Sequence, residues 1–131
     1  MAANKDLEQQ YGRAMEEHGF LPDPENQRYG SMGLCWRHTS QQGGGFFWTY
    51  GQQDLYTIKI HDFFFHEDQL LEFHWPESLS VTWYESISGE EFSPCRRLVP
   101  GCVKSFIGGR EPYRALIHRQ IPIVSIGVEI T

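Results

Sequence analysis

Basic residues are scarce in this sequence. Its 131 residues include 11 Lys and Arg against 17 Asp and Glu, a formal net charge of -6 at pH 7. A surface that binds duplex or single-stranded nucleic acid needs an excess of basic side chains. We therefore do not expect this chain to contact DNA itself.

Cysteine is also rare, and its spacing is uninformative. The three cysteines, Cys35, Cys95 and Cys102, form no C-x-x-C pair. An odd number without such a pair excludes a disulfide framework and a structural zinc site. A reducing, cytoplasmic location is the expectation that fits best.

Long apolar runs are missing as well. The first ten residues are mostly polar where a signal peptide would need an apolar stretch. No segment approaches the roughly 18 apolar residues of a membrane-spanning helix. We expect neither secretion nor insertion into a membrane.

The composition favours one folded domain over residues 1–131, because 40% of the residues are hydrophobic and 15% aromatic. A helix is predicted over 4–19, where Asp6 and Gln9 approximate a capping box and apolar residues recur at helical spacing. Pro22 and Pro24 then predict a loop as far as Gly33, since proline cannot donate to a strand ladder.

Beyond that loop the pattern is that of short strands bounded by glycine and proline. The predicted strands span 33–39, 45–50, 55–65, 69–74, 79–87, 102–107, 113–118 and 121–130. Many short strands with a single helix favour an all-β sandwich or barrel over 33–131. Because the chain stops directly after an apolar strand, we also expect it to be one domain of a longer protein.

Several segments resemble the N-terminal sensing domain of arabinose-regulator (AraC-type) transcription factors. They are LYTIKIHD (55–62), LSVTWYESISGEE (79–91), YRALIHR (113–119) and IPIVSIGVEI (121–130). The resemblance implies a cupin-like jelly roll that takes a small effector. It also implies a C-terminal pair of helix-turn-helix units, absent from this chain, through which the intact protein would bind DNA.

Metal chemistry is weighed because cupin folds often hold a metal with histidines and a carboxylate. The candidates are His61, Asp62, His66, Glu67, Asp68, Glu72 and His74, with His38 and His118 able to join only through tertiary folding. His61 and His66 are five residues apart and fall on opposite faces of an unbroken strand, whereas cupin metal sites usually pair histidines two apart. The chain also lacks the G-x-S-x-G motif, which positions the nucleophilic serine of α/β-hydrolases. We therefore assign no catalytic residue, no metal ligand and no cofactor.

A ligand pocket is predicted from the alternation of the 79–87 strand. Its apolar residues share one parity, which should point inward and carry Trp83 and Glu85 with it. Together with Trp48 and Phe63 these residues form the predicted ligand-binding set, in which aromatic rings stack on a cationic or hydroxyl-bearing effector. Alternatively, Glu85 lies in water or pairs with Arg114 or Arg119.

The predicted function is that of a non-enzymatic, small-molecule-sensing and dimerising domain of a transcriptional regulator. Its expected partners are an unidentified effector, DNA only through the absent C-terminal domain, and a second copy of the chain in a homodimer. Two alternatives stay open: a small metal-dependent cupin enzyme and a ligand-free dimerisation module.

Overall fold

The structure is a computed structural model that describes residues 15–30, 33–39, 41–52, 55–74, 77–92 and 95–130. Eleven strands run through these residues. They are β1 (Phe20–Pro22), β2 (Leu34–His38), β3 (Gly43–Gln52), β4 (Tyr56–Phe65), β5 (Gln69–Phe73), β6 (Ser78–Ser86), β7 (Gly89–Phe92), β8 (Arg96–Leu98), β9 (Cys102–Gly108), β10 (Tyr113–Ile117) and β11 (Ile123–Ile130).

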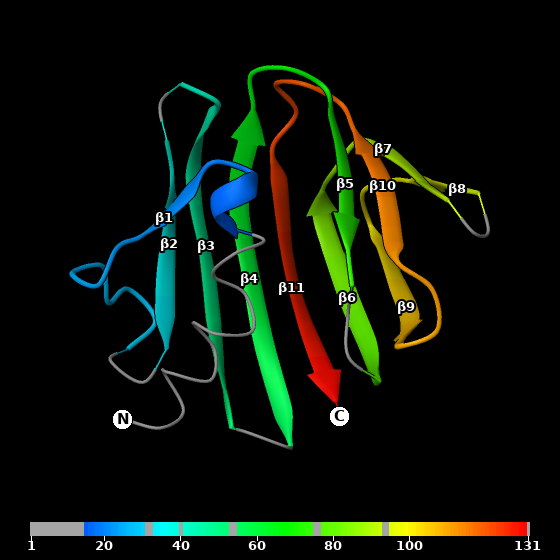
Figure 1. Cartoon of the computed structure of the whole chain (residues 1–131), viewed down its shortest axis with the longest axis horizontal. Helices are drawn as coiled ribbons and strands as arrows, with labels where there is room; N and C mark the ends of the chain where they lie inside the picture. Colours follow the sequence, from blue (N-terminus) through cyan, green and yellow to red (C-terminus); the bar gives the residue numbers. More distant parts are fainter. Residues whose placement is uncertain are drawn as a thin grey trace.

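The strands form two antiparallel sheets (Figure 1). The larger sheet has the order β1-β2-β3-β4-β11-β6-β9, and the smaller has the order β5-β10-β7-β8. The last eight strands thus form two facing four-stranded sheets, β4-β11-β6-β9 and β5-β10-β7-β8, which is the strand order of a jelly roll. The all-β, cupin-like jelly-roll fold predicted from the sequence is confirmed. Among the described residues, no helix is long and apolar enough to cross a membrane.

Aromatic side chains fill one end of the space between the sheets. Phe20, Phe63 and Phe65 are almost fully buried there, with Trp36 and Phe47 beside them. The Phe20 and Phe63 rings meet edge to face with centroids 4.9 Å apart, and Phe63 meets Phe65 at 5.5 Å. Such pairs contribute about 0.5–1.5 kcal/mol each beyond the burial of their area. This aromatic cluster fixes how the sheets come together at that end.

The N-terminal part differs from the prediction in one respect. Residues 15–17 are helical, Met15 is buried in the core, and Gly19 ends the turn with a φ of 86°. The predicted helix over 4–19 otherwise lies outside the described residues. The loop predicted up to Gly33 was wrong at its start, because Phe20–Pro22 pairs with β2. Proline is tolerated there because β1 is the edge of the sheet.

The eight predicted strands are all present, but β7 and β8 were missed along with β1. Gly43 and Gly44, predicted as loop, already belong to β3 and pair with Phe65 and Phe64. Close backbone contact explains these glycines, since a Cβ on Gly43 would lie 2.0 Å from the carbonyl oxygen of Phe64. The strand therefore begins earlier than composition suggests.

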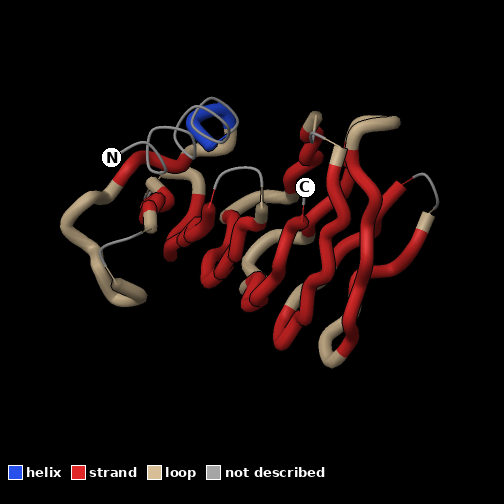
Figure 2. Tube along the Cα trace, turned by 90° about the horizontal axis from the view of Figure 1, so that it is seen from below, coloured by secondary structure: helices blue, strands red, loops and turns tan. Residues whose placement is uncertain are grey.

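Part of the larger sheet exposes apolar residues on its outer side. On β11, Ser125 and Glu129 are buried while Ile126 and Ile130 are about half exposed. On β6, Tyr84 is buried whereas Trp83 is 45% exposed. Figure 2 shows the helical turn on one side of this sheet and, among the described segments, no further layer against β4 and β11 on the other side. The prediction that the apolar parity of the 79–87 strand points inward was therefore wrong.

A β-bulge in β6 changes which residues of that strand face inward after Tyr84. Tyr84 pairs with Ser125 and Ser86 pairs with Val124, so Glu85 is left as the extra residue of the bulge. An extra residue reverses which parity faces inward. Ile87 is consequently buried, although it shares sequence parity with the exposed Trp83.

Candidate functional site

A cavity of about 120 Å³ lies between the two sheets, next to the aromatic cluster. Its walls come from inward-facing residues of both sheets and from the helical turn. Apolar rings form much of the lining, but Lys59, His61 and Lys104 also border it. His18 borders it near the helical turn. Nitrogen-bearing side chains inside a protein need a specific reason to be there, because burying polar groups is costly unless they are paired.

One row of paired residues crosses the inner face of the larger sheet and positions Lys59 and Lys104. Gly127 of β11 pairs with Lys59 of β4 on one side and with Thr82 of β6 on the other, and Thr82 pairs with Lys104 of β9. Three strand spacings of about 4.8 Å separate the two lysine backbones. A Cβ on Gly127 would lie 2.6 Å from the Thr82 hydroxyl. The row thus has a cation at each end and no room for a side chain at Gly127.

Lys59 is held by a buried carboxylate. Its Nζ donates a hydrogen bond to Glu129 Oε2 at 2.6 Å, and the Glu129 side chain is 1% exposed. Burial lowers the pKa of Lys59, while Glu129 opposes that shift. Two opposite charges in such a site stabilise each other, so removing one is expected to cost several kcal/mol.

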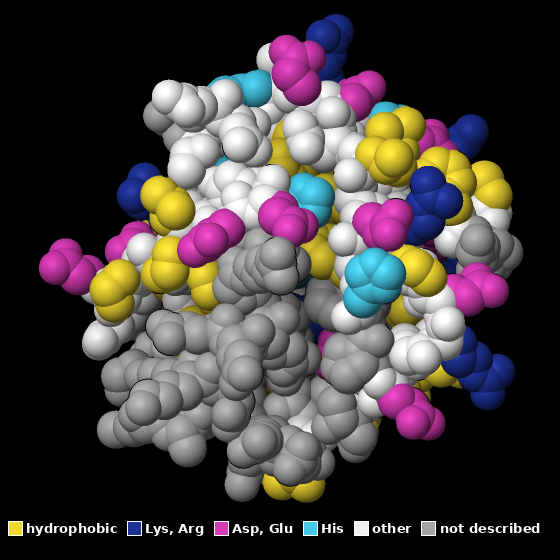
Figure 3. Space-filling view, viewed as in Figure 1, with side chains coloured by type: hydrophobic (Ala, Val, Ile, Leu, Met, Phe, Trp, Pro, Cys, Tyr) yellow, Lys and Arg dark blue, Asp and Glu magenta, His cyan; other side chains and the backbone are white. Residues whose placement is uncertain are grey.

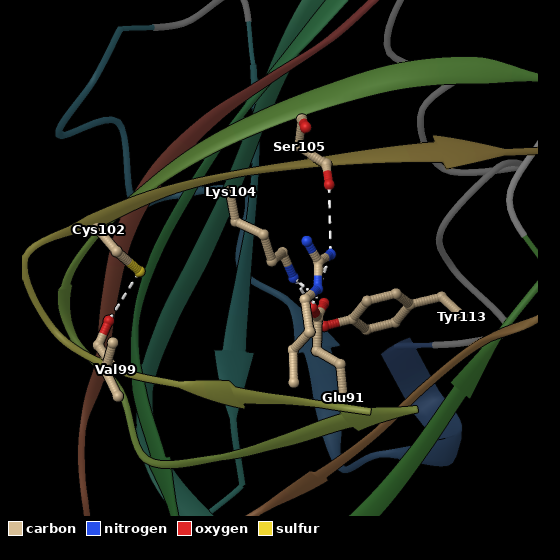
Figure 4. Close-up of polar contacts among 7 residues, drawn as sticks. Glu91, Val99, Cys102, Lys104, Ser105 and Tyr113 are labelled. Atoms are coloured by element: carbon tan, nitrogen blue, oxygen red, sulfur yellow. Dashed lines mark hydrogen bonds and ion pairs between the residues drawn. The ribbon is translucent and has the colours of Figure 1, made fainter. Parts of the chain in front are cut away.

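Lys104 lies in a second ion pair that bridges the sheets (Figure 4). From β9 its Nζ donates to Glu91 of β7 and to the hydroxyl of Tyr113 of β10, the latter at 3.0 Å. The ammonium also lies 4.8 Å from the Tyr113 ring centroid. Arg96 reaches the other carboxylate oxygen of Glu91 at 3.1 Å from the more exposed side. Burial lowers the pKa of Lys104 and raises the pKa of Tyr113.

His61 has a ring nitrogen without a hydrogen-bond partner among the described residues that border the cavity. Its ring stacks on Phe47 with centroids 4.5 Å apart, and its Nε2 atom is buried with no hydrogen-bond partner in the described structure. Burial, reinforced by the positive charges of Lys59 and Lys104, lowers the pKa of His61 to about 3. The imidazole is therefore neutral at physiological pH and has a ring nitrogen free to donate or accept.

Together these groups make a cavity suited to binding. Each lysine charge is matched by a buried carboxylate, Arg96 adds a further positive charge at one end, and His61 offers an unused hydrogen-bonding atom. A ligand with a polar head and an apolar body would find partners for both parts.

The four residues predicted to bind a ligand are not brought together. Phe63 borders the cavity as expected. Trp83 and Glu85 are exposed on the outer face of β6, so their predicted inward orientation was wrong. Trp48 lies on the outer side of β3, where the Tyr29 ring packs against it at 4.9 Å. Trp48 lines a separate groove of about 220 Å³, in which tyrosine supplies the only titratable side chains among the described lining residues.

The histidines and carboxylates considered as metal ligands are also dispersed. His38 is buried near β1, where its two ring nitrogens lie 3.0 and 3.1 Å from backbone carbonyl oxygens of Phe64 and His18. His118 pairs with Glu90 and Ser88, and His74 with Glu72, on the surface. Within the described ranges, no three His, Cys, Asp or Glu side chains are placed to hold one metal ion.

The sequence did contain a signal for the cavity. On β4, residues Thr57, Lys59 and His61 share one parity, and on β11 Ser125 and Glu129 do the same. Polar residues at alternate positions of two central strands can line a polar interior as well as a wet surface. Whether such residues line an interior or a wet surface depends on how the strands pair and on the smaller sheet that covers them.

Comparison with known proteins finds similarity in structure. No protein-family model and no curated protein matches the chain. The chain is similar to KdgF from Halomonas sp., with 12% identity, a TM-score of 0.46 and coverage of 88% of this chain and 89% of that one. It is similar to a sugar phosphate isomerase of the cupin superfamily from Silicibacter pomeroyi DSS-3, with 12% identity, a TM-score of 0.43 and coverage of 65% and 59%. HutD from Pseudomonas fluorescens SBW25 is similar at 13% identity and a TM-score of 0.44, with coverage of 86% and 56%.

Proposed function

We propose that this chain binds one small organic molecule in the cavity between its sheets, and that the ligand places a hydroxyl or carboxylate group against Nε2 of His61. The buried, unpartnered Nε2 is the observation that carries the proposal. Leaving such a polar atom unpaired costs about 1–3 kcal/mol. A ligand that completes the hydrogen bond recovers this free energy and so gains affinity.

The size and the charges of the cavity narrow the class of ligand. A dry apolar cavity of roughly 150 Å³ can hold benzene, so the 120 Å³ here suits a single ring or a short branched chain. Phe63, Tyr84 and Phe106 supply apolar surface for such a body. The ammonium groups of Lys59 and Lys104 disfavour a cationic ligand. The expected ligand is therefore neutral or anionic and contains about ten non-hydrogen atoms or fewer.

We further propose that this binding serves regulation, with the chain acting as the effector-binding half of a transcription factor. The resemblance of segments 55–62, 79–91, 113–119 and 121–130 to arabinose-regulator sensing domains supports this role. Contact with DNA would belong to a separate C-terminal domain, in keeping with the acidic charge of this chain. The effector would bias that domain by its differential affinity for two arrangements of the protein.

Thermal unfolding in the presence of three matched probes tests the binding proposal. Benzoate, benzyl alcohol and benzylammonium share a ring and differ in the charge of the head group. We expect benzoate or benzyl alcohol, at tenfold excess over its Kd, to raise the melting temperature by several degrees. Benzylammonium should leave it unchanged.

Two variants complete this test. His61→Phe keeps a ring of similar size, removes Nε2 and should abolish the shift. His74→Phe makes the same change at a histidine exposed on the surface and should preserve it. If none of the three probes stabilises the wild type, or if His61→Phe responds as the wild type does, the proposal is wrong.

The enzyme alternative stays a prediction with an experiment of its own. Stoichiometric iron, manganese, nickel or zinc in the purified protein, removable by a chelator, would favour a metal-dependent cupin enzyme. Metal analysis by mass spectrometry makes the distinction without requiring a substrate.

A further inference from the structure

The outer face of the larger sheet carries a continuous lattice of apolar side chains, which we name the outer patch. Twelve positions on β4, β11, β6 and β9 form three cross-strand rows. The rows are Tyr56–Ile130–Leu79–Ile107, Ile58–Val128–Val81–Ser105 and Ile60–Ile126–Trp83–Val103. Ser105 is the one position that is not hydrophobic.

These side chains are open to solvent to an unusual degree. Nine of them are between 36% and 65% exposed, with Val103 and Ile107 at the upper end. Side chains of this size have full accessible areas of roughly 150–250 Å², so together they present on the order of 800 Å². The largest apolar patch on a typical monomer is about 300–600 Å². The outer patch therefore exceeds what a monomer normally leaves uncovered.

Charged groups are absent from the three rows. The acidic residues nearest to the rows are Asp62 and Glu85, which follow the last row along their strands, and the exposed Glu77, which lies two residues before Leu79. The face with the helical turn, seen in Figure 3, instead carries acidic, basic and histidine side chains among its hydrophobic ones. A chain with a net charge of -6 thus has one surface on which a second copy can approach without confronting its carboxylates.

We propose that two copies of this chain pack through the outer patch, face to face about a two-fold axis. A stable dimer of standard size buries about 800 Å² on each partner, which is the area that this patch offers. A two-fold interface needs only a surface that complements itself. A twisted sheet of aliphatic residues meets that need, since two such sheets interdigitate at about 10 Å separation. The proposal is independent of ligand binding, because the cavity opens on the other side of the sheet.

Sedimentation velocity over a range of protein concentrations tests the dimer. The wild type should sediment as a species of twice the 15.3 kDa chain mass. Ile126→Lys places a charge within the patch on both copies and should raise the dissociation constant by about 100-fold or more, because each lysine would be buried without a partner.

Leu70→Lys is the matched control. Leu70 is 55% exposed on β5 in the smaller sheet, outside the outer patch, and its variant should remain a dimer. Circular dichroism establishes that each variant is folded, and Trp83→Ser, a neutral change within the patch, should weaken the dimer less than Ile126→Lys. A wild type that stays monomeric would overturn the proposal and indicate that another segment or protein covers the patch. A dimer that Ile126→Lys leaves intact would also overturn it.

Discussion

The two faces of the same four strands differ in the residues that depart from the usual pattern of a sheet: charged groups lie among the buried rings on one face, and apolar groups are exposed on the other. Facing the smaller sheet, β4 and β11 carry Lys59, His61 and Glu129. Facing away from it, the same strands carry Ile126 and Ile130, which are half exposed. Antiparallel sheets normally put the apolar face on the core and the polar face in water. Each face thus departs from that pattern, and the binding and dimer proposals rest on these two departures.

The main energetic cost is buried charge on the inner face and exposed apolar surface on the outer face. On the inner face, ion pairs satisfy most of the buried charge, and Nε2 of His61 is buried without a hydrogen-bond partner. On the outer face, the cost of exposed apolar surface is removed if a second copy covers it. Changes on the inner face should therefore alter stability and ligand binding, whereas changes on the outer face should alter association. The following predictions test that separation.

The largest expected effect comes from Glu129→Ala. The change leaves the Lys59 ammonium buried without its carboxylate, so the free energy of unfolding should fall by about 3–5 kcal/mol. Urea unfolding at fixed protein concentration measures it. Glu72→Ala, which removes an exposed carboxylate beside Arg114, should cost less than about 1 kcal/mol. Equal losses in the free energy of unfolding from the two substitutions would show that the Lys59–Glu129 pair does not stabilise the fold.

A smaller effect is expected in the pH dependence of the free energy of unfolding. The pKa of His61 is lowered to about 3 in the folded protein and is near 6.5 in an unfolded chain. The unfolded state therefore binds more protons as the pH falls from 6.5 towards 3, and stability is lost over that window. Relative to His61→Gln, the wild type should lose about 2–3 kcal/mol between neutral pH and pH 4.5. Parallel curves of stability against pH for the two proteins would show that His61 titrates normally.

Gly127→Ala should have the smallest effect of the three on unfolding. The new methyl group would lie 2.6 Å from the Thr82 hydroxyl on the inner face, so neighbouring groups must shift. We expect a loss of about 1–2 kcal/mol. Ser105→Ala, within the outer patch, changes a position with open space and should alter the free energy of unfolding by less than about 0.5 kcal/mol. A neutral Gly127→Ala would mean that the inner row is not closely packed.

Much of the fold could be predicted from local patterns. Glycine and proline lie near the ends of many of the eight predicted strands, because both residues are disfavoured inside ladders. Gly43 and Gly44 show the limit of this rule, since both pair within β3. The short β7–β8 hairpin, with Arg96 and Glu91 opposite each other, gave no apolar alternation to detect. β1 was missed because proline excludes a central strand but not an edge strand.

The candidate site could be predicted only in part. Phe63 borders the cavity, and its predicted contact with a ligand stays a prediction. Trp83 was expected there too, but its inward direction assumed that the apolar parity faces the core. Two features invisible to local sequence overrode that assumption, the bulge at Glu85 and the outer patch. The pairs Lys59–Glu129 and Lys104–Glu91 join strands distant in sequence, so no spacing rule reveals them.

The most direct test of the central claim is nuclear magnetic resonance of the His61 ring nitrogens with and without benzoate. The account predicts a neutral imidazole at pH 5.5 and a change in the Nε2 resonance on saturation with benzoate, while the Trp83 indole resonance does not move. A His61 ring that is protonated at that pH, or a response confined to Trp83, would place the ligand on the wrong face of the sheet and contradict the account.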